Sequence, residues 1–551
     1  MDSLAQEATL MAAPPCQVLM VHPRFTAPSF WNCRVSCELF GARYPSPPLG
    51  LITVAALLPP SWRVRLVDRN TDDLTPADLD AADLIMTGGM ISQRADTLAI
   101  IKMCKAQRKP VVIGGPDVSS NPHIFAEADF QVLGEAESVI EVFVKAWTSG
   151  KRQGVFEADR FQVDMTRSPI PRFELLQFDH YIQMAVQFSR GCPFNCEFCD
   201  IIELYGRVPR TKTRQQIVAE LDVLYQLGYR GRVFFVDDNF VGNKKELRRL
   251  LPVLIEWQRL RKYPFEFLTQ ASINLADDSQ LLETMRKANF FAVFIGIESP
   301  DTDTLISMQK KQNTRRNLAT SINRIHAAGI FVMAGFIIGF DSENGSVADS
   351  IIECIEATSI PVCLVGLLYA LANTQLSRRL QREGRLYPDP DFTLTADVIG
   401  DQCSAGLNFK TARPRRDILD DYDRILETIY RPAEYFVRVR KVGRILNRPK
   451  LGAVPLLRRI FRELPAFARL AWSSTRHPEL RKQFWRTILD CAIHNPRSLP
   501  SVCMMIALYL HFGPFSQYVR QIVRDDIALI DRGEWTESQW IAGSQPVLVP
   551  A

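Results

Sequence analysis

Cysteine is sparse in this chain, and a long uninterrupted apolar run is missing. There are 12 cysteines in 551 residues, far too few for a small domain held together by disulfides. The start, MDSLAQEATLMAAPP, has no basic stretch followed by an apolar core, so no signal peptide is expected. The longest apolar run without a charge, 501–517, is interrupted by Gly513 and Pro514, which disfavours a transmembrane helix. We therefore expect a cytoplasmic protein with reduced thiols, some of them available as metal ligands.

Charge is unevenly distributed along the chain. The net charge is only +5, but Arg431 to Asp490 contains fifteen Lys and Arg against four Asp and Glu. This segment alone therefore has a net charge of +11. Because the whole chain has only +5, the rest of the chain has a net charge of −6. Such asymmetry indicates that one region of the protein meets an anionic partner. The composition, 47% apolar and 23% charged, is that of a folded soluble protein and excludes a mainly disordered chain.

The first part of the chain alternates short β-branched runs with helical patterns. The runs are 18–21, 64–67, 84–86, 111–113 and 130–133. This alternation predicts βα units around a buried parallel sheet, a Rossmann-like α/β domain over residues 1–157. Glycines follow several of these strands, at the edge where open parallel sheets bind ligands. Neither GxGxxG nor GxxxxGK[ST] occurs here, which disfavours a dinucleotide site or a P-loop.

The rest of the chain divides into a barrel and a helical part. After a linker over 158–183, six further strand-like runs with helical patterns between them predict a partial (β/α)6 barrel over 184–387. Functional residues are expected where its strands end. Residues 388–551 read as helical, amphipathic and rich in arginine, and are expected to form a basic C-terminal domain.

The most informative segment is RGCPFNCEFCD, directly after the first barrel strand. It places Cys192, Cys196 and Cys199 in a C-x3-C-x2-C spacing on one short loop. Three thiolates on one loop can hold three corners of a cubane iron–sulfur cluster and leave one iron open. A structural zinc site needs a fourth nearby ligand, and no histidine is close in the sequence.

This loop, with Phe198 before the last cysteine, resembles the signature of radical S-adenosylmethionine (radical SAM) enzymes. The segments DDNF, GIES and GFIIGF end the second, fourth and fifth barrel strands and resemble the family's cofactor-binding motifs. The resemblance implies a [4Fe–4S] cluster on the three cysteines and S-adenosyl-L-methionine chelated at the open iron. It implies that Phe198 packs near the adenine and that Asp237, Glu298 and Gly339 line the cofactor pocket. DDNF departs from the commoner Gly-Gly-Glu, so the contacts of its individual side chains stay open.

The first part resembles the cobalamin-binding domain that precedes this barrel in one branch of the family. The matching segments are PPLGL, GGP and GEAE. The resemblance implies a cobalamin site whose rim includes Gly88, Ser92, Gly115 and Gly134. The D-x-H-x-x-G loop that supplies a histidine below cobalt is absent. His22 is therefore interpreted as a packed histidine at a strand end, not as a cobalt ligand.

The order of cobalamin domain, radical barrel and helical domain is similar to that of the hopanoid C-2 methylase group. The resemblance implies a methyltransferase that acts on an unactivated carbon of a hopanoid or another lipid-like substrate. An S-adenosylmethionine-derived radical would remove a hydrogen, and methylcobalamin would deliver the methyl group. It also implies an electron donor such as flavodoxin or ferredoxin. No acid or base residue can be chosen from the sequence.

Other functions remain open at this point. A cyclase, or a methylase acting on a soluble natural-product intermediate, would use the same cofactors. A methylthiotransferase would need a second cysteine triad near the N-terminus, and Cys16, Cys33 and Cys37 lack its spacing. A non-catalytic iron–sulfur or cobalamin sensor would need a nucleic-acid motif that we do not find, so no nucleic acid is expected as a partner.

The basic C-terminal part mixes aromatic and cationic residues. Apolar residues recur at helical spacing, namely Leu457, Phe461, Leu464, Phe467 and Trp472. Pro465 is expected to split this stretch into two short helices. Farther on, Phe484 and Trp485 are surrounded by basic residues. One interpretation is a helical bundle with a solvated basic face. The other is a peripheral contact with the inner face of the cytoplasmic membrane.

Overall fold

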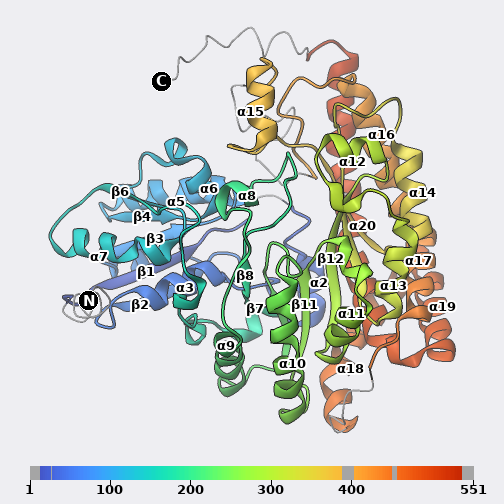
Figure 1. Cartoon of the computed structure of the whole chain (residues 1–551), viewed down its shortest axis with the longest axis horizontal. Helices are drawn as coiled ribbons and strands as arrows, with labels where there is room; N and C mark the ends of the chain where they lie inside the picture. The colour runs from blue at the N-terminus through green and yellow to red at the C-terminus, as the bar shows by residue number, and fades with distance from the viewer. Residues whose placement is uncertain (1–12, 26–27, 388–402, 450–455, 536–551) are drawn as a thin grey trace.

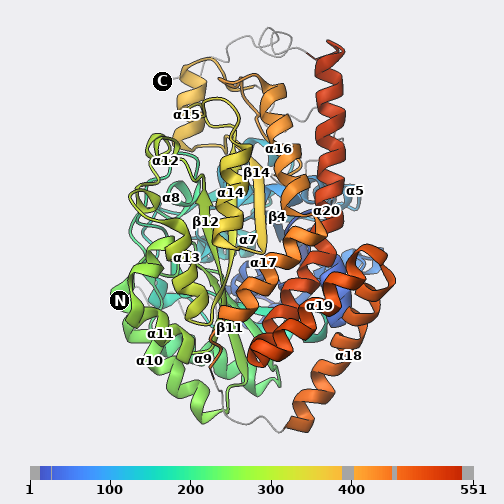
Figure 2. The ribbon, with the colours of Figure 1, turned by 90° about the vertical axis from the view of Figure 1, so that its right-hand side faces the viewer.

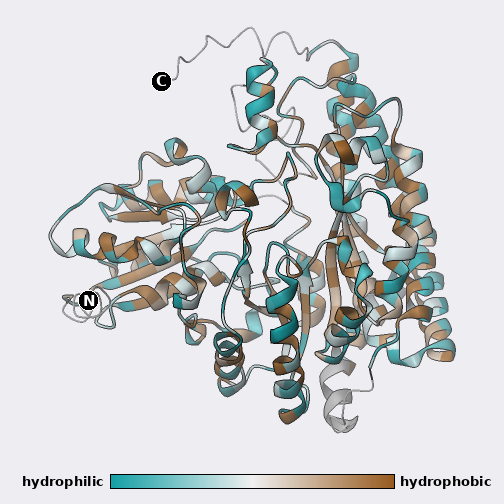
Figure 3. Ribbon diagram, in the orientation of Figure 1, coloured by the Kyte–Doolittle hydropathy of each residue, from teal (hydrophilic) through white to brown (hydrophobic). Residues whose placement is uncertain are grey.

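A computed structural model describes residues 13–25, 28–387, 403–449 and 456–535, with side chains of 456–463 left out (Figure 1). Two parallel six-stranded sheets stand side by side, and a set of long helices covers the far side of the second sheet (Figures 1 and 2). In Figure 3 the strands are mostly coloured as hydrophobic, whereas the outer helices mix hydrophilic and hydrophobic residues, as expected of helices with one face toward solvent. The predicted fold class, α/β with a Rossmann-like domain, a partial barrel and a helical C-terminal part, is confirmed.

The first sheet has the strand order β2-β1-β3-β4-β5-β6, and every pair of neighbours is parallel. Its strands are β1 (Gln17–His22), β2 (Arg63–Asp68), β3 (Leu84–Gly88), β4 (Val111–Gly114), β5 (Phe130–Leu133) and β6 (Gly154–Glu157). The helices of this part are α2 (Arg34–Phe40), α3 (Leu49–Leu57), α4 (Pro76–Asp80), α5 (Arg94–Ala106), α6 (Pro116–Ser120) and α7 (Ile140–Thr148). Separate apolar clusters cover its two faces, and the inner strands β3 and β4 are accordingly almost wholly apolar, as parallel sheets require.

The second sheet has the sequential order β7-β10-β11-β12-β13-β14, again all parallel. Its strands are β7 (Gln183–Val186), β10 (Gly231–Phe235), β11 (Phe265–Gln270), β12 (Phe290–Glu298), β13 (Phe331–Ile338) and β14 (Val362–Leu367). A small antiparallel pair, β8 (Ser189–Arg190) and β9 (Arg210–Thr211), brackets the cysteine loop. The helices are α8 (Ile201–Leu204), α9 (Arg214–Gln226), α10 (Lys244–Leu260), α11 (Ser279–Lys287), α12 (Thr302–Ser307), α13 (Leu318–Ala327), α14 (Ala348–Thr358) and α15 (Gln375–Arg382).

The open side of this partial barrel, between β7 and β14, is closed by segments far apart in the sequence. The loop before α2 and the helix itself pack on α20 (Leu499–Asp531). Phe30 stacks on Phe512 with ring centroids 4.4 Å apart, and Ser36 Oγ donates to the Ala507 carbonyl at 2.9 Å. Trp31 lies 5.8 Å from the ring of Phe294 on β12. The first part of the chain thus contributes to the barrel as well as to its own sheet.

The C-terminal helices are α16 (Arg415–Ile429), α17 (Pro432–Ile445), α18 (Leu456–Arg476), α19 (Pro478–His494) and α20. Two proline expectations are wrong: α18 continues through Pro465, and α20 runs unbroken for 33 residues through Gly513 and Pro514. At Pro514 packing outweighs the local cost of proline, since Phe512, Gly513 and Phe515 are buried. Pro496–Asp531 is long and apolar enough to cross a membrane, but 72% of its apolar window is buried inside the protein. Its apolar surface is used in the core.

Candidate active site

The cysteine loop is shaped by a glycine and two aspartates at its start. Gly191 has φ +95°, and a Cβ there would lie 2.9 Å from the Gly206 carbonyl oxygen, so no other residue fits this turn. Its N–H donates to Asp238 Oδ2 at 2.8 Å. Asp237 accepts from the N–H groups of Phe188 and Ser189 at 3.1 and 2.5 Å. The two carboxylates following β10 therefore fix the chain as it leaves β7 for the cysteines.

The three predicted cysteines come together at this end of the sheet. Burial raises the pKa of the Cys192 and Cys199 thiols, and the charges of neighbouring triad sulfurs add to the rise. Asn239 Nδ2 lies 3.8 Å from Cys192 Sγ, and Gln312 Nε2 lies 3.7 Å from Cys196 Sγ. In the described part of the chain, no three His, Cys, Asp or Glu side chains close tightly enough to hold a single ion. Three neighbouring sulfurs that are too widely spaced for one ion, two of them reached by amide N–H donors, suit a multinuclear cluster.

Glu298 ends β12 in a strained conformation beside the cysteines. Its φ is +66°, which is uncommon for a residue other than glycine. Its carboxylate lies 2.5 Å from Lys310 Nζ, and both side chains are about nine-tenths buried. A Cβ at Gly296 would fall 2.2 Å from Glu298 Oε1 and 2.8 Å from Lys310 Nζ, so glycine makes room for the pair. The predicted site residue Glu298 thus meets a buried cation.

Lys310 links this pair to the cysteine loop. Burial lowers the pKa of its ammonium, but Glu298 and the Cys196 and Cys199 thiolates raise it above the ordinary value overall. Its Nζ lies 5.8 Å from the ring of Phe198, which in turn packs edge-on against Phe340 at 6.0 Å. Sequence reasoning missed Lys310. Its position twelve residues after Glu298 on a different element carried no signal of a contact.

Buried acceptors without partners mark the same place. Within the described residues, Gln312 Oε1 and Asn313 Oδ1 are buried and make no hydrogen bond. Asn313 Nδ2 donates to the Gly296 and Ile297 carbonyls, which places this amide against the end of β12. Unpaired buried acceptors are costly, so their presence beside the thiols fits a polar ligand there. The residues at this site therefore fit a cluster and a polar cofactor bound to it.

Two other predicted cofactor residues have partners within the chain. Asp237 is fully buried and its carboxylate is held by Phe188 and Ser189, with burial raising its pKa to about 7. Gly339 has φ +102°, donates its N–H to Glu343 at 2.9 Å, and would place a Cβ 2.6 Å from Leu407. Both shape the strand ends around the site, and their cofactor contacts stay predictions.

The predicted cobalamin rim lies at the carboxyl edge of the first sheet. Gly88 and Gly114 bring β3 and β4 into backbone contact, since a Cβ at Gly88 would fall 2.1 Å from the Gly114 carbonyl oxygen. Gly115 has φ +99° and Gly134 has φ +80°. Ser92 is largely buried in the short turn after β3. The glycines leave this edge nearly free of side chains, which fits a large flat ligand.

The edge of the first sheet meets the cysteine loop directly. A narrow cleft is lined by Gly134 and neighbours from the first part and by Glu203 and Leu204 of α8. Beside it, Arg190 contacts Glu135 at 3.0 Å and Glu137 at 2.7 Å, and Arg210 contacts Glu135 at 2.8 Å. The two glutamates of the GEAE segment, Glu135 and Glu137, thus form ion pairs with Arg190, which directly precedes the cysteine loop.

His22 has no ring nitrogen free to face that cleft. Its Nδ1 lies 3.0 Å from Asp68 Oδ1, and its Nε2 lies 3.0 Å from Gln93 Nε2. Asp68 is further held by the Tyr181 hydroxyl at 2.9 Å. The interpretation of His22 as a packed strand-end histidine agrees with these contacts.

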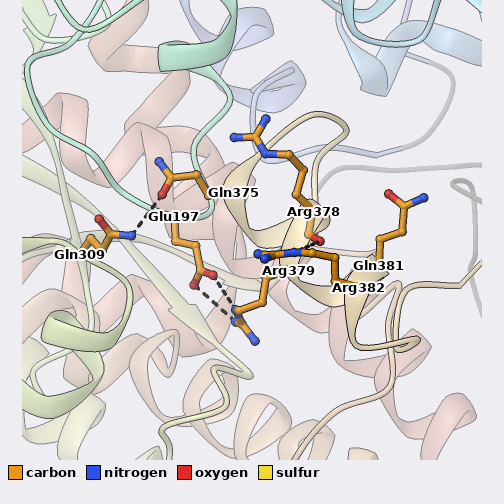
Figure 4. A pocket seen from close by; sticks show the side chains of 7 residues that line it. All are labelled: Glu197, Gln309, Gln375, Arg378, Arg379, Gln381 and Arg382. Carbon is orange, nitrogen blue, oxygen red and sulfur yellow. Dashed lines mark hydrogen bonds and ion pairs between the residues drawn. The ribbon is translucent and has the colours of Figure 1, made fainter. Parts of the chain in front are cut away.

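A polar pocket of about 790 Å³ lies on the other side of the cysteine loop (Figure 4). Its lining residues are Glu197, Gln309, Gln375, Arg378, Arg379, Gln381 and Arg382. Arg379 contacts Glu197 at 2.6 Å and Asp341 at 2.8 Å, while Leu376 N–H donates to the Glu197 carbonyl at 3.0 Å. Helix α15 therefore packs on the outside of the cysteine loop, and this pocket lies beside that loop.

Comparison with known proteins decides the family. Residues 186–355 match the radical SAM superfamily, and residues 374–524 match a domain of unknown function, DUF4070. An uncharacterised methyltransferase of Synechocystis sp. is 41% identical over 93% of this chain and 94% of its own. The hopanoid C-2 methylase of Rhodopseudomonas palustris is 39% identical over 70% of this chain and 73% of its own. The chain belongs to the radical SAM superfamily.

This radical SAM protein has the fold of the cobalamin-dependent branch. The S-adenosylmethionine radical enzyme OxsB, solved with aqua-cobalamin and S-adenosylmethionine, has a TM-score of 0.56 at 15% identity and covers 96% of this chain and 83% of its own. The methyltransferase TsrM of Kitasatospora setae, solved with cobalamin and a [4Fe–4S] cluster, has a TM-score of 0.55 at 15% identity, over 70% of this chain and 78% of its own. The predicted family and its cofactors, a [4Fe–4S] cluster and S-adenosylmethionine, are confirmed, and the protein is a radical SAM methyltransferase.

Proposed function

We propose that this radical SAM methyltransferase uses cobalamin to methylate an unactivated carbon of an apolar, polycyclic, lipid-like substrate of the hopanoid kind. The observation that carries the proposal is an apolar wall inside the barrel, formed by the half-buried residues Phe294, Met333 and Ile337. The similarity to a hopanoid C-2 methylase over most of that protein's length supports it.

Half-buried apolar residues line the interior of the barrel. A Cβ at Gly335 would lie 3.3 Å from the Phe294 ring and 3.7 Å from Glu298 Oε2, so this face of β12 and β13 is the one that meets the site. Met333 and Ile337 alternate with Gly335 on the same face and are half-buried, whereas the residues between them are fully buried. A surface that is apolar and only partly covered inside a protein suits an apolar ligand.

Further residues extend this wall across the sheet. Phe294 pairs in register with Gln270 on β11 and with Met333 on β13, and Phe234 on β10 pairs with Leu268. Trp31, reaching in from the first part of the chain, is 36% exposed beside Phe294. The polar atoms of the site, by contrast, gather at one end, on Glu298 and Lys310. A rigid apolar substrate would lie against this wall with one of its carbon atoms facing Glu298 and Lys310.

The chain's own residues supply positioning at the cofactor sites. When bound, the cluster, S-adenosylmethionine and cobalamin supply hydrogen abstraction from an unactivated carbon and the methyl group that replaces the hydrogen. Cys192, Cys196 and Cys199 hold the cluster, and the glycine edge with Gly88, Gly115 and Gly134 seats cobalamin. The Arg190 contacts to Glu135 and Glu137 keep the two sites at a fixed separation, which a transfer between bound groups requires.

The reducing electron comes from a small donor protein such as flavodoxin or ferredoxin. The cysteine loop reaches the surface at the polar pocket, where Arg378 and Arg382 are exposed on α15. Exposed guanidinium groups this close to the cysteine loop provide a positively charged docking surface for an acidic electron-donor protein.

The test is anaerobic incubation of the reconstituted protein with a pentacyclic triterpenoid, a reductant and S-adenosylmethionine carrying a deuterated methyl group. We expect 5′-deoxyadenosine together with a triterpenoid that has gained one labelled methyl group. The Cys192→Ala, Cys196→Ala, Cys199→Ala triple variant is the control and should give neither. A cyclised or unlabelled product, or labelling only of soluble natural-product intermediates, would contradict the proposed substrate class.

A further inference from the structure

Two neighbouring C-terminal helices expose apolar side chains in regular lines. On α19, Trp485, Leu489 and Ile493 follow at four-residue steps and are 41%, 59% and 74% exposed. On α18, Leu464 and Trp472 are 55% and 66% exposed. Four-residue steps place side chains on one face of a helix. Each helix therefore presents an apolar line to solvent.

The two lines belong to one surface, because α18 and α19 pack against each other. They are joined by His477 alone, Phe467 lies 6.5 Å from Phe484 between them, and Trp485 Nε1 donates to Thr475 Oγ1 at 3.1 Å. Phe467 and Phe484 lie at the contact between the two helices and do not belong to the exposed apolar lines. Figure 2 shows both helices on the outside of the molecule. The side chains of Leu457 and Phe461 lie outside the described residues.

Five exposed basic residues lie on or beside these two helices, and none of the five has a carboxylate partner among the described residues. The exposed ones are Arg476, Arg481, Lys482, Arg486 and Arg497. None of them forms an ion pair with another described residue, although Arg476 lies over the Trp472 ring at 5.4 Å and Arg481 donates to the Thr475 carbonyl. Surface arginines of the barrel helices differ, since Arg248, Arg259 and Arg286 each contact a carboxylate. The charge at α18–α19 is therefore not neutralised within the described chain.

We propose that the α18–α19 surface, defined by Leu464, Trp472, Trp485, Leu489 and Ile493 with the five basic residues above, binds an anionic lipid bilayer. Exposed Trp and aliphatic residues flanked by Arg and Lys are the pattern of helices that lie in the membrane interface. The apolar side chains enter the headgroup region, and the cations meet lipid phosphates. The protein is thereby a peripheral protein of a membrane surface. Charge complementarity selects an anionic bilayer over a neutral partner or a second copy of this basic surface.

The core helix α20 is not part of this contact. Its apolar residues pack on α2, α16, α17 and α19. A deletion after Arg440 would remove α20 and uncover the barrel, so loss of membrane binding by that deletion would say nothing about the surface. Point variants of exposed residues are required.

The experiment is co-sedimentation of the full-length protein with vesicles of phosphatidylcholine alone, or of phosphatidylcholine and phosphatidylglycerol, at low and high salt. We expect pelleting with the anionic vesicles at low salt that falls at high salt, and little with neutral vesicles. The triple variant Arg481→Gln, Lys482→Gln, Arg486→Gln should lower the partition at least about tenfold. The double variant Leu489→Ser, Ile493→Ser should lower it as well. Leu260→Ser and Lys245→Gln, which alter an exposed apolar and an exposed basic residue of α10, should leave it unchanged.

Two further measurements, of enzyme activity and of oligomeric state, separate the possible explanations of a change in vesicle binding. Reductive cleavage of S-adenosylmethionine in solution should be equal in all these variants, which separates a failed surface from a failed enzyme. Equal pelleting with both kinds of vesicle, pelleting with neither, or an unchanged partition in the variants would overturn the proposal. So would a dimer in solution that the Leu489→Ser, Ile493→Ser variant dissociates, because the surface would then be covered by a second copy.

Discussion

Arg190 Nη2 lies 2.7 Å from Glu137 Oε1, and this contact joins the two parallel sheets beside the cysteine loop. Glu137 follows β5 of the first sheet, and Arg190 ends β8 directly before Gly191 and Cys192. The side chains are only 12% and 7% exposed. Burial alone would raise the pKa of Glu137, but Arg190 lowers it below the ordinary value. The carboxylate is therefore charged at neutral pH and holds the two domains together.

Replacement of Glu137 by glutamine should weaken the contact between the two domains and lower the free energy of unfolding. Removing one partner of a buried pair costs about 3–5 kcal/mol, and Glu135 still contacts Arg190, so we expect a loss on the order of 2 kcal/mol. Thermal unfolding measures the loss, and amide exchange over 188–192 should quicken. Glu174→Gln, whose partner Arg172 is at the surface, is the matched control and should change little. Equal losses of stability in the two variants would contradict a stabilising role for the Arg190–Glu137 ion pair.

Lys310→Met should impair S-adenosylmethionine cleavage. It leaves the Glu298 carboxylate buried without its cation, at a residue whose φ is already +66°. We expect 5′-deoxyadenosine formation to fall about 100-fold, the equivalent of about 3 kcal/mol. Lys311→Met changes the exposed neighbour and should retain full cleavage. If both variants behave alike, the Glu298–Lys310 pair does not organise the site.

The triple variant with alanine at Cys192, Cys196 and Cys199 should fold and take up no cluster. The loop is held by other contacts, from Gly191 to Asp238 and from Leu376 to Glu197. Iron analysis after anaerobic reconstitution and circular dichroism measure the two outcomes. Cys354→Ala removes a half-buried thiol elsewhere and should reconstitute normally. Iron retained by the triple variant would show that the cluster is bound at another place.

Cobalt should have no histidine ligand from this chain when cobalamin is bound. Both ring nitrogens of His22 are engaged, by Asp68 and Gln93. Electron paramagnetic resonance of the cob(II)alamin form should show no splitting from an imidazole nitrogen, and His22→Ala should leave that spectrum unchanged. A nitrogen splitting that disappears in His22→Ala would contradict this expectation.

Glu343 should make stability depend on pH. Burial raises its pKa from 4.5 to about 7, although it contacts the Gly339 N–H and Arg413. Between these two values the folded chain keeps a proton that the unfolded chain has lost, so the stability contribution is present at low pH and is lost as pH rises through the folded pKa. Relative to Glu343→Gln, the wild type should lose on the order of 3 kcal/mol over this range.

The difference in thermal midpoint between the two proteins, followed from pH 4.5 to above 7, measures this effect. The midpoint of the wild type minus that of the variant should fall as pH rises and then level off above pH 7. A difference that is constant with pH would mean that Glu343 is ionised throughout in the folded protein.

Sequence alone determined the features that are local or periodic. Each of the eleven strand-like runs overlaps a strand of the structure, although 184–189 runs past the end of β7 to β8. Apolar β-branched runs bounded by glycine have few alternatives. The cysteine motif could also be recognised from the sequence, because its three cysteines lie within eight residues. The likeness of whole segments to one family then indicated the cofactors.

Only the tertiary structure decided which distant residues meet. Glu298 and Lys310, Arg190 and Glu137, and Trp31 and Phe294 lie on different elements, and no pattern in the sequence pairs them. Likewise, Pro465 and Pro514 do not end their helices, and Phe467 lies at the contact between α18 and α19 while Trp472 is exposed. The physical reason is packing, as at Pro514, where the neighbouring Phe512 and Phe515 are buried. Local propensity amounts to about 3 kcal/mol even for a proline, and the burial of neighbouring side chains, which depends on what packs against them, exceeds it.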